Sequence, residues 1–130
     1  MKRALIVDDD PLIRSLLREA LESLEFEVDE KEHGEAAREV VEKNQYDLIL
    51  LDLVMPGLSG NELVHKIREG TMNRRSKIVI ASAYRLATRR SDPKFEALVD
   101  LFLEKPIYVL DAQRQISKLF EEKPPPEPGR

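Results

Sequence analysis

A run of four aliphatic residues that ends in a carboxylate constrains the fold of this chain more than any other stretch. Residues Leu48 to Leu51 are continuously apolar, and Asp52 follows them directly. Such a run is typical of a strand that is buried on both faces, at the centre of a parallel sheet covered by helices. Asp52 is therefore expected at the carboxyl end of a central strand, where open α/β sheets place their chemistry. From the residues alone it could be a nucleophile, a metal ligand or a helix cap.

Predicted strands and amphipathic helices alternate along the whole chain. Apolar runs predict further strands at residues 4–7, 77–81 and 101–103, and alternation of apolar and polar residues predicts one at 26–31. Helices are predicted after Pro11, at about 35–43, from a Ser59–Glu62 capping box to Gly70, in a short stretch opened by Pro93, and at about 109–122. These five alternations predict an α/β fold with a doubly wound, five-stranded parallel sheet and five helices. The polar stretch 83–90 receives no assignment.

The first predicted helix buries one face and exposes the other. Its apolar stripe runs from Ile13 to Leu24 at helical spacing. The opposite face carries Arg14, Ser15 and Arg18, which are expected to be mostly solvent-facing. Asp10, just before the helix, is expected to be a helix cap or a solvated acid.

The composition limits the classes of function that the chain can have. Its 130 residues suffice for one domain with its own core. The absence of cysteine excludes disulfides and thiolate metal sites and fits a cytoplasmic protein, and no apolar run approaches a membrane span. The net charge of −4 argues against nucleic-acid binding by this domain. The Pro-rich segment 123–130 is predicted to be an extended tail or linker.

Polar side chains stand where the predicted strands end. Asp8 and Asp9 follow the first strand, Asp52 the third and Lys105 the fifth, while Ser82 ends the fourth. Parallel strands end at one edge, so three carboxylates would meet there and repel each other by about 4 kcal/mol per pair at 4 Å and a dielectric constant near 20. Such a cluster must bind protons or a cation, and oxygen ligands favour Mg²⁺. Together with a lysine and a hydroxyl, these groups are suited to phosphoryl transfer.

Four motifs resemble the receiver domain of response regulators in two-component signalling. They are Val7–Pro11, Leu51–Gly57, Ala81–Ala83 and Glu104–Pro106, in that order. The resemblance assigns residues 1–122 to a receiver domain and leaves 123–130 as a tail or linker. It also implies the flavodoxin-like strand order 2-1-3-4-5.

The resemblance implies a role for each polar residue. It makes Asp52 the phosphoacceptor and Lys105 the phosphate-binding lysine. The Mg²⁺ ligands would be Asp8, Asp9, Asp52 and the backbone carbonyl of Val54. The switch residues would be Ser82 and Phe102, and the peptide bond before Pro106 would be cis.

The implied partners are a histidine kinase or histidine phosphotransfer protein as donor, and a downstream output protein or domain. Phosphorylation would change the surface formed by the fourth helix, the fifth strand and the fifth helix. The protein would catalyse only its own phosphorylation and slow dephosphorylation, and would not be an enzyme in the ordinary sense. The sequence does not name the kinase, the output or the oligomeric state, nor whether the chain is a whole protein or an excised domain.

Several positions depart from the family pattern. Val54 stands two residues after the acceptor, and Tyr84 stands two residues after the switch serine. An apolar residue and a bulky residue at these positions suggest slow self-dephosphorylation. Leu98-Val99-Asp100 replaces a frequent Gly-Ala-Asp, so an irregular fourth helix is expected. Tyr108 stands where many relatives carry a polar helix cap.

Two other functions remain open from the sequence. An aspartyl-phosphate phosphatase of the haloacid dehalogenase type would need a second aspartate two residues after the nucleophile, where this chain has Val54. A receiver-like interaction module that is never phosphorylated would not need all five polar residues, and all five are present.

Overall fold

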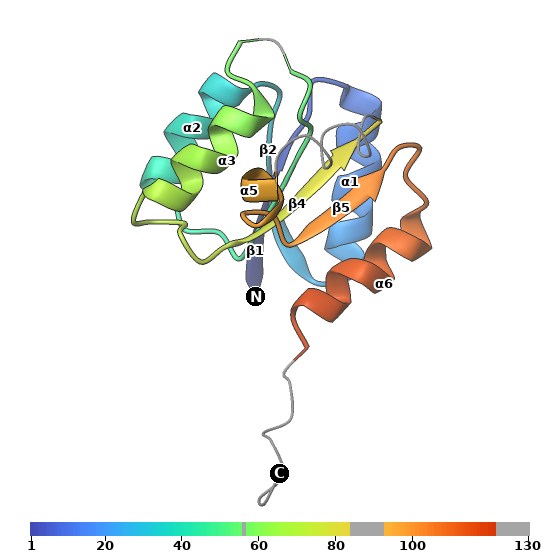
Figure 1. Cartoon of the computed structure of the whole chain (residues 1–130). Helices are drawn as coiled ribbons and strands as arrows, with labels where there is room; N and C mark the ends of the chain where they lie inside the picture. Colours follow the sequence, from blue (N-terminus) through green and yellow to red (C-terminus); the bar gives the residue numbers. More distant parts are fainter. Residues whose placement is uncertain (56, 84–92, 122–130) are drawn as a thin grey trace, which may run out of the picture.

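Five parallel strands form one sheet in the order β2-β1-β3-β4-β5 (Figure 1). The computed structural model describes residues 1–55, 57–83 and 93–121. The strands are β1 (Lys2–Val7), β2 (Phe26–Lys31), β3 (Leu48–Leu51), β4 (Lys77–Ser82) and β5 (Leu101–Glu104). The helices of the described residues are α1 (Pro11–Ser23), α2 (Gly34–Lys43), α3 (Gly60–Glu69), α5 (Pro93–Glu96) and α6 (Val109–Leu119). The predicted fold class and strand order are confirmed, and the described residues contain five helices, the number predicted.

Helices cover both faces of the sheet. In Figure 1, α1 and α6 lie on one side, and α2, α3 and α5 lie on the other. Each side has its own apolar cluster: Leu17, Leu21 and Ile116 belong to the first, while Leu63 and Phe95 belong to the second. All four residues of β3 are fully buried, because β3 has a strand on each edge and helices over both faces. In the described parts of the chain, no helix has the length and apolar character that a membrane span needs.

The helix ends agree with the predicted capping signals except at α6. Asp10 caps α1 by accepting a hydrogen bond from the Leu12 N–H at 2.9 Å, and Ser59 caps α3 by accepting one from the Glu62 N–H at 3.2 Å. Tyr108 makes no side-chain cap for α6. The predicted end of α6 near residue 122 is wrong, because the helix stops at Leu119.

A tertiary contact coincides with the early end of α6. The N–H of Phe120 bonds to the carbonyl of Ser117, a tighter bond than that of an α-helix. The Phe120 ring packs edge-on against Phe26 at a centroid distance of 5.5 Å. This contact with β2 holds Phe120 against the sheet at the point where the helix ends.

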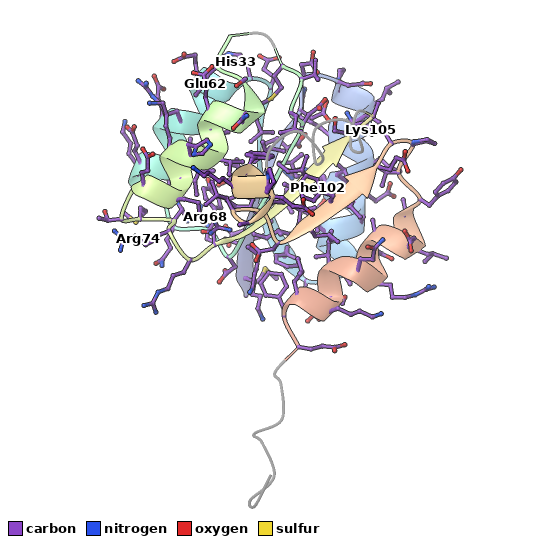
Figure 2. The ribbon with its side chains drawn as sticks, in the orientation of Figure 1. His33, Glu62, Arg68, Arg74, Phe102 and Lys105 are labelled. Carbon is purple, nitrogen blue, oxygen red and sulfur yellow. The ribbon has the colours of Figure 1, made fainter. Side chains whose placement is uncertain are left out.

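The connection that leads into β5 is held by one arginine of α3. Arg68 donates hydrogen bonds to the carbonyl of Leu98 at 2.9 Å and of Ser76 at 2.8 Å, and it pairs with Asp100 at 3.0 Å (Figure 2). The Asp100 carboxylate also accepts the N–H of Ile78 at 2.8 Å. The α5 helix is short, as predicted for the stretch that Pro93 opens. The unassigned stretch 83–90 lies, apart from residue 83, outside the described residues.

The first turn of α3 lies directly against the end of β3. A Cβ atom added at Gly60 would lie 2.5 Å from the Asp52 carbonyl oxygen and 2.6 Å from the Leu53 Cα. Both neighbours are backbone atoms, so neither can turn aside as a flexible side chain could. The glycine thus allows α3 to approach the segment that carries Asp52.

We predict that Gly60→Ala lowers the free energy of unfolding by about 1–3 kcal/mol, because the added methyl group forces the backbone near Asp52 to move. Gly70→Ala is the matched control, since its Cβ would meet its nearest neighbour, the Lys66 carbonyl, at 3.2 Å. Urea unfolding of both variants measures the difference. Equal losses of stability would show that the close approach at Gly60 has no special weight.

Candidate functional site

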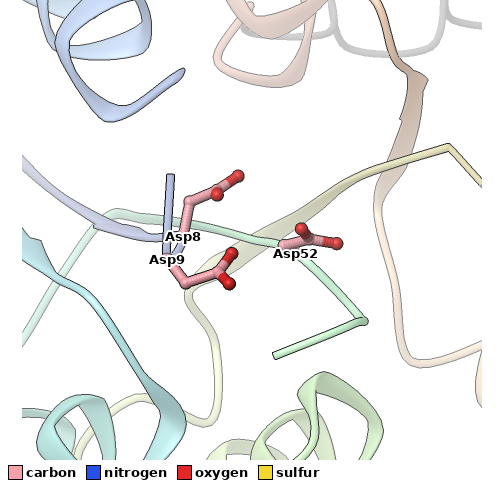
Figure 3. Close-up of side chains that lie close together, drawn as sticks. All are labelled: Asp8, Asp9 and Asp52. Atoms are coloured by element: carbon pink, nitrogen blue, oxygen red, sulfur yellow. The ribbon is translucent and has the colours of Figure 1, made fainter. Parts of the chain in front are cut away.

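Three carboxylates converge at the carboxyl edge of the sheet. Asp8 and Asp9 follow β1, and Asp52 follows β3. Figure 3 shows the three side chains around one small space, and each offers an oxygen within 4.8 Å of the others. Asp8 is buried with 1% of its surface exposed, Asp52 has 7% exposed, and Asp9 is exposed. The predicted convergence of the acids is therefore present in the structure.

A bend in the backbone lets two consecutive acids reach the same space. Successive side chains of a strand point to opposite faces, so Asp8 and Asp9 could not both face this space from an extended strand. The chain bends at Asp9, and the Asp8 carboxylate accepts the N–H of Asp10 at 2.9 Å. Asp10 then caps α1. The bend is thus held by side chains on both sides of Asp9.

Lys105 supplies the positive charge of the site. Its Nζ lies 2.9 Å from an Asp8 oxygen and 3.0 Å from an Asp52 oxygen. The lysine follows β5 and lies at the upper edge of the sheet in Figure 2. Its backbone N–H bonds to the carbonyl of Ser82 at 3.2 Å, and the peptide bond from Lys105 to Pro106 is cis. One lysine therefore bridges the acids of two strands.

Burial and ion pairing have opposite effects on the pKa values of the charged groups in the site. Burial raises the pKa of Asp8, while the Asp10 N–H and Lys105 act to lower that pKa and the Asp52 charge adds to the rise. Burial acts to lower the pKa of Lys105, but hydrogen bonds and charges from Asp8 and Asp52 outweigh it, so that the pKa is raised. Lys105 is therefore a stable cation between the two acids.

Two donors fix the orientation of the Asp52 carboxylate. The N–H of Val54 donates to one oxygen at 3.1 Å, and Lys105 donates to the other. The Asp52 N–H bonds to the carbonyl of Val7 at 3.0 Å, which ties the residue to β1. Val54 is 58% exposed, so this residue lies at the surface, two residues after Asp52. The Val54 carbonyl as a metal ligand stays a prediction.

The predicted switch residues lie on β4 and β5, the two strands next to β3 on one side of the sheet. Ser82 ends β4 and is 1% exposed, and Phe102 of β5 is half-buried. The Phe102 ring meets Phe95 of α5 edge-on at 6.5 Å between centroids. Their roles as a switch stay a prediction. Tyr84 lies outside the described residues.

The sequence interpretation of Arg14 as mostly solvent-facing is wrong. Its side chain is 17% exposed, and its guanidinium donates to the carbonyl of Asp8 at 2.6 Å. Helical periodicity places Arg14 on the polar face of α1, and it gives no information on a side chain that reaches back past the helix start. The signal in the sequence was only the nearness of an arginine to the Asp8–Asp9 pair.

The site fits a small divalent cation. Its donors are carboxylate oxygens from two strands, and the exposed Asp9 leaves one side open to water. Mg²⁺ favours a few carboxylates with several retained waters over a closed protein cage. Asp8, Asp9 and Asp52 would therefore hold the ion, with Lys105 as a neighbouring cation.

The fold and this site define a class of signalling domain, and the chain belongs to the response regulator receiver domain family. The family model matches residues 4–120. This agrees with the family resemblance carried by the four sequence motifs.

Particular relatives support the same assignment. The transcriptional regulatory protein ResD of Bacillus subtilis is 42% identical over 105 residues, which cover 80% of this chain and 42% of ResD. The response regulator TrrA of Thermotoga maritima, solved in complex with Mg²⁺ and BeF, is 37% identical with a TM-score of 0.80 over 92% of this chain and all of TrrA. A structure of TrrA in complex with the histidine kinase ThkA gives a TM-score of 0.79 at 36% identity, over 93% of this chain and 100% of the matched chain. The chain spans about two fifths of the length of the curated relatives that it matches.

We predict that Mg²⁺ stabilises the wild-type protein and that Asp9→Asn removes most of this effect. Binding to the folded state alone adds about 2.7 kcal/mol at a concentration of 100 times the dissociation constant. Asp10→Asn is the matched control, because it makes the same chemical change one residue later and asparagine also caps helices. Thermal unfolding at rising Mg²⁺ measures the three proteins. An Asp9→Asn protein that responds like the control would exclude Asp9 as a ligand.

Proposed function

We propose that this chain is a phosphoaccepting response regulator whose Asp52 carboxylate takes a phosphoryl group from a histidine kinase or histidine phosphotransfer protein. The observation that carries the proposal is the meeting of Asp52 with Asp8, Asp9 and Lys105 at one open edge of the sheet. The complexes of TrrA with Mg²⁺ and BeF, and with the kinase ThkA, support it by similarity.

The transfer makes one bond and breaks one. A carboxylate oxygen of Asp52 attacks the phosphorus atom, and the bond between phosphorus and the donor imidazole nitrogen breaks. The electron pair of that bond stays on the nitrogen, which takes a proton from solvent. The product is an acyl phosphate on Asp52 and an unmodified histidine on the donor.

The residues around Asp52 position the reacting groups. The Val54 N–H and Lys105 hold the two carboxylate oxygens, so the nucleophile is oriented before the donor arrives. Lys105 would then bind an oxygen of the incoming phosphoryl group as a compact cation. Mg²⁺ held by Asp8, Asp9, Asp52 and the Val54 carbonyl would offset the negative charge that the acids and the phosphoryl group share.

Phosphorylation would then alter a surface away from the site. It places close to two negative charges and new acceptor oxygens on Asp52. In this proposal the Ser82 hydroxyl moves toward them, and Phe102 turns into the space behind it. The surface made by α5, β5 and α6, which includes Phe102, would thereby change its affinity for an output protein or domain. The protein acts as a phosphoryl carrier that turns over only its own modification.

We predict that the wild-type protein, incubated with acetyl phosphate and Mg²⁺, gains the mass of one phosphoryl group, and that Asp52→Asn does not. Intact-mass spectrometry measures both proteins, with Asp10→Asn as the control for loss of a nearby carboxylate. A wild-type protein that never gains mass would favour the unphosphorylated interaction module. A mass gain in Asp52→Asn would place the acceptor elsewhere.

We also predict that Val54→Asn shortens the lifetime of the phosphorylated protein. Val54 is exposed and follows the acceptor by two residues, and an amide in place of its isopropyl group could orient a water molecule toward the acyl phosphate. We expect hydrolysis on the order of tenfold faster, or about 1.4 kcal/mol in barrier height. Val54→Ala is the control, because it stays apolar. The loss of phosphorylated mass over time after donor removal gives both rates, and no acceleration in Val54→Asn counts against this role.

A further inference from the structure

We infer that Arg14 is a positioning residue for the cation site, which it serves by holding the carbonyl group of Asp8 and with it the bend that brings Asp9 beside Asp8. This inference rests on the proposed function, because it concerns the same acids. It assigns a task within the site to a residue of α1 that is not one of the ligands.

The peptide between Asp8 and Asp9 has to keep one orientation if both carboxylates are to face the site. Strand β1 ends at Val7, so the Asp8 carbonyl lies beyond the regular strand. Asp8 and Asp9 nevertheless have to direct both carboxylates into one space of a few ångströms. The ψ angle of Asp8 sets the direction of this carbonyl group and the course of the chain into Asp9. A change in this angle would turn the carbonyl and carry Asp9 away while Asp8 stays in place.

Among the described residues, it is Arg14 that donates a hydrogen bond to this carbonyl group. Its Nη1 lies 2.6 Å from the Asp8 oxygen, a short and charge-assisted hydrogen bond. The Asp8 N–H on the other side of the residue bonds to the carbonyl of Lys31 at 3.2 Å. The backbone of Asp8 is thus fixed by β2 at its N–H and by α1 at its carbonyl.

Glu30 of β2 holds Arg14 in place. One Glu30 oxygen lies 3.3 Å from Nε of Arg14, and the other lies 2.6 Å from Nε of Arg18. Arg18 also donates to the carbonyl of Val28 at 2.9 Å, which anchors this arrangement to β2. The guanidinium of Arg14 is therefore oriented by one contact while it holds the Asp8 carbonyl with another. Arginine can do both because its donors form a rigid fork, whereas lysine offers a single point charge.

Arg14 and Arg18 differ in their contact with the Asp8 carbonyl group, which is the difference that the inference requires. Both pair with Glu30, both belong to α1, and both are partly buried. Only Arg14 has a bond to the Asp8 carbonyl among the bonds of the described residues. A general effect of the ion pairs on stability would appear in variants of either arginine, but an effect on the bend would appear only at Arg14.

We predict that Arg14→Lys weakens Mg²⁺ binding by about tenfold, at the lower end of what outer contacts contribute to metal affinity. Arg18→Lys is the matched control and should change binding by less than about twofold, since lysine keeps the charge in both variants and Arg18 does not touch the Asp8 carbonyl. Isothermal titration calorimetry with Mg²⁺ alone gives the dissociation constants. Amide hydrogen exchange at Asp9 and Asp10 without metal should be faster in Arg14→Lys and unchanged in Arg18→Lys.

The outcomes separate this inference from the proposed function. Equal Mg²⁺ affinity and equal exchange in the two variants would overturn the role of Arg14, even if the wild-type protein takes up phosphate normally. A wild-type protein that binds Mg²⁺ but is never phosphorylated would contradict the proposed function, and the comparison of the two variants would still decide the role of Arg14. Should Arg14→Lys fail to fold, exchange at Asp9 and Asp10 in Glu30→Gln provides the second test. Faster exchange there supports the inference, and wild-type exchange overturns it.

Discussion

Repulsion among three carboxylates at one edge of the sheet is the constraint on which the rest of the site depends. The parallel sheet makes this gathering unavoidable, because strands that run in the same direction all end at the same edge. Asp8 and Asp52 are almost completely buried there, so water cannot screen them well. The Lys105 ammonium group, within 3.0 Å of both, keeps the folded chain compatible with that charge. The same arrangement leaves Asp9 open to solvent and the acids ready for a cation.

Much of the fold could be predicted because burial leaves a direct trace in the sequence. Strands covered on both faces, such as Leu48–Leu51, appear as unbroken apolar runs, and polar residues stand out where those runs end. Asp8, Asp52 and Lys105 were predicted to converge for this reason alone, without any knowledge of distances. The caps at Asp10 and Ser59 were also readable, since a helix start depends on neighbours only a few residues away.

Contacts that long side chains make away from the strand ends could not be predicted. The end of α6 coincides with the contact between Phe120 and Phe26, and no local signal marks that contact. Helical spacing predicts a solvent-facing Arg14, because it describes where a side chain starts and not how far a long side chain reaches. Arg68 donates hydrogen bonds to the carbonyls of both Leu98 and Ser76, which are far apart in the chain. In each case a long polar or aromatic side chain makes a tertiary contact.

The position of Lys105 has a consequence for how the protein is made. Asp8 precedes it by 97 residues and Asp52 by 53, so both acids leave the ribosome long before their counter-charge exists. Until Lys105 joins them, Asp8 and Asp52 depend on water and dissolved ions for screening. The site is therefore complete only when β5, the last strand along the chain, has paired with β4 at the edge of the sheet.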